Sequence, residues 1–117
     1  MRVEQQFHPG MLPIDGYGPG FFRISGEVHN GMVAVLPTGV VGWGGMDDSG
    51  EFRAASDQID LLLVGTGAEA QQLTGHFRNT LTACRIDVEA MPTPAACRTY
   101  NVLLAEGRRV AVALMPV

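Results

Sequence analysis

A continuous apolar run, Leu61-Leu62-Leu63-Val64, is the feature that most constrains the fold of this chain. A strand with one face in water alternates apolar and polar side chains, whereas an unbroken apolar run is typical of a strand covered on both faces. Helices that cross from one parallel strand to the next cover a sheet in this way. The run therefore predicts a central strand of an α/β sheet.

An amphipathic helix is predicted after this strand and the short turn Gly65-Thr66-Gly67. Apolar residues recur at spacings of three or four, the period of one helix face. They are Ala70, Leu73, Phe77, Leu81 and Cys84. A strand is expected next, at residues 86–90, so the helix would connect two neighbouring strands.

A second helix and a last strand complete the C-terminal half. Thr93 suits the N-cap, Pro94 suits the first helical position and Gly107 suits the residue that ends the helix. The apolar stripe of this helix is Ala96, Cys97, Tyr100, Leu103 and Leu104. With a strand at 109–115, the order is strand, helix, strand, helix, strand, which favours parallel neighbours joined by crossover helices.

The N-terminal half predicts an antiparallel β unit. Strands are expected at 21–28, 32–36 and 40–43, with turns at His29-Asn30-Gly31 and Pro37-Thr38-Gly39. The first 20 residues are expected to form an irregular, turn-rich arm, and residues 44–56 a loop. The fold class is therefore α/β, with a central mixed, mostly parallel sheet and an N-terminal antiparallel β unit, in a single domain spanning 1–117.

Composition excludes several classes of protein. The formal net charge of −4 argues against nucleic acid as a main partner, because phosphate binding needs a concentrated positive field. The N-terminal sequence MRVEQQFHPG lacks the apolar core of a signal peptide. No apolar run reaches the roughly 18 residues that a membrane span needs. We therefore expect a cytoplasmic protein.

Three segments resemble the Mth-938-like family, also called domain of unknown function 498. They are IDGYGPGFFRISG at 14–26, DLLLVGTG at 60–67 and EAMPTPAACRTYNVLLAEGRRVAVAL at 89–114. That family includes the mitochondrial assembly factor for respiratory complex I. The resemblance implies a central mixed sheet with helical layers, and a role in complex I assembly, but no catalytic residue. Arg85 stands where the family usually has Gly, so a positive φ there would cost about 1 kcal/mol.

Two groups of residues are candidates for a ligand site. Gly65, Thr66 and Gly67 lie where a buried strand meets a helix, and amides at a helix start can hold an anion. The alternative is a tight turn without a ligand. Cys97 could be a nucleophile near a helix N-terminus. However, no histidine can be placed beside it, and its position on the apolar stripe favours buried packing.

Arg98 and Asn101 lie at the polar margin of the same helix, and three roles are open to them. Arg98 could pair with a carboxylate such as Glu106 or Asp87, and Asn101 could cap a neighbouring strand or hydrogen-bond backbone within the fold. Both could instead face a partner protein or a small acid. Arg98, Arg108 and Arg109 could also form an anion-attracting patch.

The function predicted from these features is that of a non-catalytic protein-binding module without metal or cofactor. The module could also form a homo-oligomer. Five apolar residues in Gly-rich segments are candidates for an exposed contact surface. They are Met11, Leu12, Ile14, Trp43 and Met46. The alternative is a binding protein or enzyme for a small anionic ligand, which the turn at 65–67 and Arg98 would hold.

Overall fold

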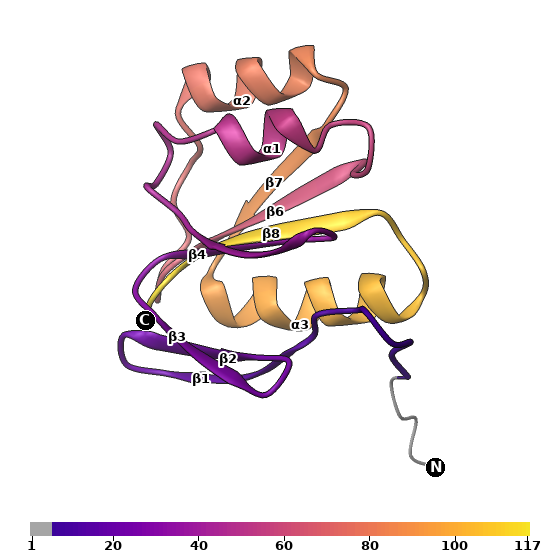
Figure 1. The fold of residues 1–117 in the computed structure, drawn as a ribbon. Helices are drawn as coiled ribbons and strands as arrows, with labels where there is room; N and C mark the ends of the chain where they lie inside the picture. Colours follow the sequence, from indigo (N-terminus) through magenta and orange to yellow (C-terminus); the bar gives the residue numbers. More distant parts are fainter. Residues whose placement is uncertain (1–5) are drawn as a thin grey trace.

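The computed structural model describes residues 6–117, which form two β-sheets and three helices (Figure 1). The larger sheet has five strands in the order β5-β4-β8-β6-β7, and the smaller has the order β1-β2-β3. The elements are β1 (Ile14–Gly18), β2 (Phe21–Ile24), β3 (Glu27–Asn30), β4 (Val33–Leu36), β5 (Gly39–Gly42), α1 (Gly50–Ala54), β6 (Leu61–Thr66), α2 (Gly75–Ala83), β7 (Asp87–Met91), α3 (Thr93–Ala105) and β8 (Val110–Met115).

The apolar run forms β6, the central strand of the parallel part of the larger sheet. β6 pairs in parallel with β7 on one side and with β8 on the other, and its residues 62–66 are all buried. The predicted strand-helix-strand-helix-strand order and the mixed α/β class are confirmed. The hairpin of β4 and β5 extends this sheet through an antiparallel pairing of β4 with β8.

The order of the parallel strands places the two long helices on opposite faces of the sheet. From β6 the chain crosses through α2 to β7, and it then crosses back over β6 through α3 to β8. Both crossovers are expected to be right-handed, so reversing their direction moves the second helix to the other face. Figure 1 shows α1 and α2 above the sheet, and α3 with the three-stranded sheet below it.

Each face of the larger sheet has its own apolar core. The core under α1 and α2 contains an aromatic cluster of Trp43, Phe52 and Phe77, whose ring centroids lie 6.1–6.5 Å apart. The other core joins Cys97 and Tyr100 of α3 to residues of the larger sheet and of the small sheet. The small sheet therefore shares a core with α3.

The N-terminal half differs from the sequence prediction in three ways. Residues 14–18, expected in an irregular arm, form β1. The strand expected at 21–28 is divided by a tight turn at Ser25-Gly26, where both residues have positive φ (47° and 86°). Such a two-residue turn matches the twist of a hairpin. The hairpin expected at 29–31 is wrong, because β3 and β4 belong to different sheets. The predicted turn at 37–39 does connect β4 to β5.

Two helices also depart from the prediction. The helix expected from residue 70 begins only at Gly75, where the Thr74 hydroxyl accepts a hydrogen bond from the Phe77 amide at 3.2 Å. Leu73 is nevertheless buried. The apolar spacing that includes Leu73 therefore indicated burial, although this residue is not part of the helix. The expected loop at 44–56 contains α1, which buries Phe52. The buried residues Phe52, Ala55 and Ile59, of which only Phe52 lies within α1, are spaced by three and four, and this helix-like signal was missed.

Arg85 has a left-handed backbone conformation, with φ at 63°. This is the conformation that the family resemblance suggested for a position usually occupied by glycine. Arg85 follows α2, where its amide donates to the Thr82 carbonyl at 2.9 Å and the Ile86 amide donates to the Leu81 carbonyl at 3.1 Å. These bonds end the helix and turn the chain into β7. A side chain at this φ costs about 1 kcal/mol, which glycine would avoid.

None of the helices in the described part of the chain has the length and apolarity that crossing a bilayer requires. The N-terminal stretch MRVEQQFHPG, from which no signal peptide was expected, lies partly outside the described residues, which begin at residue 6.

Candidate functional site

The polar residues of α3 hold the N-terminal segment onto the fold. The Asn101 side chain accepts a hydrogen bond from the Ile14 amide at 2.9 Å and donates one to the Ile14 carbonyl at 2.7 Å. The Tyr100 hydroxyl donates to the Leu12 carbonyl at 3.0 Å. Of the roles open to Asn101, hydrogen bonding to backbone within the fold is the one observed.

The turn Gly65-Thr66-Gly67 is tightly connected to the start of α3. The Gly67 amide donates to the Thr93 hydroxyl at 2.8 Å, and this hydroxyl donates to the Met115 carbonyl at 2.6 Å. Thr93 is therefore not the N-cap, which is Pro92. A Cβ built on Gly65 would lie 2.8 Å from the Thr93 hydroxyl oxygen, so Gly65 is needed for the close approach of helix and strand.

Helix α2 starts too far along the chain for its N-terminal amides to lie at this turn. Its first residue is Gly75. The single proton of the Thr66 hydroxyl lies between the Glu69 carbonyl at 2.7 Å and the Met91 carbonyl at 3.2 Å, and the hydroxyl oxygen accepts from the Gln71 amide. An anion at the turn would have to compete with these bonds or use other amides. Ligand binding by Gly65, Thr66 and Gly67, with Arg98 and Asn101, stays a prediction.

The arginines have different surroundings. Arg98 is exposed, and within residues 6–117 it forms no ion pair with Glu106 or Asp87. Arg109 does pair with a carboxylate, Asp60, at distances of 3.0 and 3.2 Å. Since both partners of this pair are more than half exposed, water screens it and it contributes little to stability.

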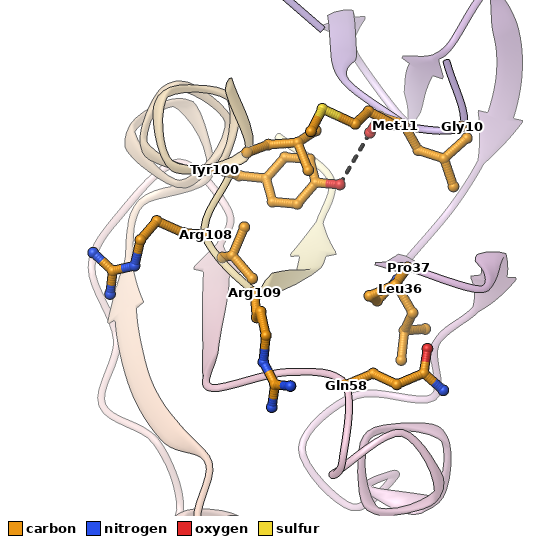
Figure 2. Close-up of a pocket in the computed structure, with 11 residues that line it drawn as sticks. Gly10, Met11, Leu36, Pro37, Gln58, Tyr100, Arg108 and Arg109 are labelled. Carbon is orange, nitrogen blue, oxygen red and sulfur yellow. Dashed lines mark hydrogen bonds between the residues drawn. The ribbon is translucent and has the colours of Figure 1, made fainter. Parts of the chain in front are cut away.

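A cavity of about 240 Å³ lies at the end of α3, against the tethered N-terminal segment (Figure 2). We call it the α3 pocket. Its lining comes from segments far apart in the sequence: Gly10, Met11, Leu12, Leu36, Pro37, Gln58, Tyr100, Leu104, Arg108, Arg109 and Val110. Figure 2 shows Arg109 and Gln58 at one end of the pocket and Arg108 directed away from it. Arg98 is not part of the lining.

The predicted apolar surface is only partly formed. Ile14 and Trp43 are buried in the two cores, each 5% exposed, so they were wrongly placed on the surface. The Trp43 indole donates to the Asp48 carbonyl at 2.9 Å, which satisfies its one polar group. Met11 and Leu12 do line the α3 pocket. The other apolar lining residues could not be grouped from their spacing, because the fold alone brings them together.

Cys97 is buried, with 5% of its surface exposed. Burial raises the pKa of its thiol from the ordinary 9.0 to about 11, and the nearby Arg98 charge opposes this rise only in part. A thiol with such a pKa is protonated at neutral pH, which is opposite to the thiolate of a nucleophile. The packing interpretation of Cys97 therefore agrees with the structure. No cluster of three potential metal ligands occurs among residues 6–117.

The raised pKa predicts a loss of stability in alkali. The folded-state pKa of about 11 exceeds the unfolded value of 9.0, so the contribution is complete below pH 9 and is lost as the pH rises towards 11. The expected slope is about 1.4 kcal/mol per pH unit in that window. Urea unfolding at several pH values should show a shallower slope for Cys97→Ala than for the wild type, with Cys84→Ala as control. An unchanged slope in Cys97→Ala would contradict this assignment.

Comparison with known proteins identifies the family. Residues 14–115 match the family described as "Protein of unknown function (DUF498/DUF598)". The chain belongs to the DUF498 family. This match covers every strand and helix described above, from the first residue of β1 to the last residue of β8.

Two relatives of this DUF498 domain differ in what their names say. An uncharacterised protein of Rhodobacter capsulatus is 49% identical over 99% of this chain and 94% of its own length. The zebrafish protein named "NADH dehydrogenase [ubiquinone] 1 alpha subcomplex assembly factor 3" is 34% identical over 88% of this chain. The match spans 63% of the zebrafish protein, so that protein is longer than the shared part.

Solved structures confirm the Mth938-like fold. A Bartonella henselae protein, described as an outer membrane protein, superposes with a TM-score of 0.86 at 42% identity, over 93% of this chain and 98% of its own. A Bordetella pertussis protein, described as a Mth938-like domain, gives a TM-score of 0.77 at 29% identity, over 99% and 92% of the two chains.

Proposed function

We propose that this DUF498 protein is a non-catalytic binding factor that assists the assembly of respiratory complex I. The observation that carries the proposal is the 34% identity to a protein named as an assembly factor for NADH dehydrogenase, over 88% of this chain. The partner would be an unassembled subunit of complex I or a second assembly factor, met at the cytoplasmic face of the membrane.

The use of polar side chains within the fold supports a binding role over a catalytic one. Asn101, Tyr100 and Thr93 direct their side chains to backbone groups of the same chain. The Cys97 thiol is held protonated by burial. Nucleophilic catalysis needs a base beside an activated nucleophile, and these residues are instead engaged in structural contacts.

The proposal is tested by deleting the gene in a bacterium that encodes the protein and has complex I. We expect NADH:quinone oxidoreductase activity of the membranes to fall, together with the abundance of assembled complex I. Succinate oxidation should be unchanged, because it uses the same quinone pool without complex I. The wild-type gene should restore the activity. Unchanged activity and unchanged complex I abundance in the deletion strain would overturn the proposal.

A further inference from the structure

The outer strand β7 of the larger sheet has one edge without a partner strand among residues 6–117. Its neighbour in the sheet is β6, with which it pairs in parallel. The Asp87 amide donates to the Asp60 carbonyl at 2.9 Å, so the backbone groups of Asp87 face β6. Because successive residues of a strand direct these groups to alternate sides, the amides and carbonyls of Val88 and Ala90 face outward. Such outward groups are what an added strand complements.

A cleft of about 390 Å³ passes around this edge. Val88 packs in the core under α1 and α2, so the neighbouring side chains of Asp87 and Glu89 lie on the opposite, α3 side of the sheet. The lining of the cleft includes these two carboxylates, and it also includes Arg78 and Thr82 of α2. Since α2 and α3 cover opposite sides of the sheet (Figure 1), a space that reaches both sides passes around the outer edge of β7. An extended segment along β7 would lie in this cleft.

On the α2 side the wall of the cleft is positively charged. Arg78 is exposed, and it forms no ion pair within residues 6–117. The other lining residue of α2, Thr82, is uncharged. An acidic side chain of an added strand would therefore meet an unpaired guanidinium on this side.

On the α3 side the balance of charge is negative. Asp87 and Glu89 are exposed, and neither forms an ion pair in the described part of the chain. Arg108 also lines the cleft and offsets one of these two charges, whereas Asp60 is already paired with Arg109. One carboxylate charge is left, so a basic side chain of an added strand is favoured on this side.

A second copy of this chain does not complement the edge. A closed twofold dimer through β7 would pair the strand with its own copy in the antiparallel direction. Asp87 and Glu89 of both copies would then lie close together on one face of the joined sheet. Like charges opposite one another in a sheet are destabilising. The edge therefore favours a strand from a different protein.

We propose that β7 binds an extended segment of a partner protein, which adds to the free edge of the larger sheet as a further strand. Neighbouring residues of this segment carry opposite charges: the acidic residue faces Arg78, and the basic residue faces Asp87 and Glu89. The inference rests on the proposed function in so far as the segment belongs to a partner protein. Backbone hydrogen bonds supply the affinity, and the alternating charges supply the specificity.

Peptides selected from a phage-displayed random dodecapeptide library against the whole protein are the probe. We expect enriched peptides with an acidic residue next to a basic one. Their binding should slow hydrogen exchange of the Val88 and Ala90 amides by about tenfold or more, measured by NMR, because these amides gain partners. Methylating the backbone nitrogens of alternate peptide residues should abolish binding for one set and spare it for the other, since only every second residue of an added strand directs its amide to β7.

Variants of the edge and of its charges test the two parts of the inference separately. Ala90→Pro removes an outward amide but no bond to β6, and it should weaken the peptides about tenfold. Ala90→Ser, which keeps the amide, is the matched control. Arg78→Ala should weaken the peptides about threefold and remove the preference for an acidic residue, and Glu89→Gln should do the same for the basic residue. Arg53→Ala, an exposed arginine outside the cleft, should have no effect.

Four outcomes would overturn the inference. They are failure to enrich any peptide, unchanged exchange of the Val88 and Ala90 amides in the complex, binding that both sets of methylated peptides retain, and enriched peptides without neighbouring opposite charges. Sedimentation of the free protein tests the other occupant: a dimer that Ala90→Pro dissociates would place a second copy on β7, and the inference would fail. The methylated peptides decide the question even if Ala90→Pro does not fold. Because these measurements use the purified protein, they stand apart from the deletion experiment, which decides the role in complex I assembly.

Discussion

Replacing Thr93 with valine is expected to lower the free energy of unfolding by about 2–4 kcal/mol, through the loss of the two hydrogen bonds that its buried hydroxyl makes. Thr93 is fully buried, and its hydroxyl joins the Gly67 amide at the end of β6 to the Met115 carbonyl at the end of β8. Valine has nearly the same shape but neither donates nor accepts. The buried Gly67 amide and the half-buried Met115 carbonyl would then lose this partner, which urea unfolding would measure as a lower midpoint.

Two further variants separate the hydrogen bonds from other effects. Thr99→Val makes the same chemical change in a half-buried position of the same helix and should alter stability much less. Thr93→Ser keeps the hydroxyl and loses only a methyl group, so it should be the more stable of the two Thr93 variants. If Thr93→Val were as stable as the wild type, the hydroxyl would not be what joins these three segments.

The C-terminal half was predictable because its signals are local. The unbroken run at β6 reports burial on both faces, and Gly107, with a φ of 81°, ends α3 where expected. The apolar stripe of α3 also lies where its spacing places it, with Ala96, Cys97 and Tyr100 buried. In each case residues within a few positions of one another determine the outcome.

The N-terminal half was harder to predict because strand pairing depends on distant partners. A Ser-Gly pair within an apolar stretch is a turn signal, but alternation across 21–28 fits one long strand equally well. Nothing near His29 shows that β3 pairs with β2 while β4 pairs with β8, which lies about 80 residues away. Pairing with β8 decides this, so the hairpin expected at 29–31 does not form.

The candidate site illustrates the same limit. Asn101 and Ile14 are 87 residues apart, and the sequence left bonding of Asn101 to backbone open as one of three roles without naming its partner. The α3 pocket combines the N-terminal segment, the β4–β5 turn and the end of α3. Two of its lining residues, Arg108 and Arg109, were grouped from the sequence, whereas its apolar walls could be grouped only once the fold had placed them together.

Replacing Asn101 with leucine is expected to release the N-terminal segment, with a loss of about 2–4 kcal/mol in the free energy of unfolding. Leucine fills a similar volume but leaves the amide and the carbonyl of Ile14 without partners, and Ile14 is only 5% exposed. Hydrogen exchange measured by mass spectrometry should accelerate in β1 and remain slow in β6. Equal protection of β1 in the variant and the wild type would contradict this role.

An Asn101→Asp variant tests whether donation to the Ile14 carbonyl matters as much as acceptance from the Ile14 amide. An aspartate can accept from the amide, but it repels the carbonyl unless its carboxyl group is protonated. The folded-state pKa of this carboxyl should therefore be raised, so the variant should gain stability relative to the wild type as the pH falls through that pKa.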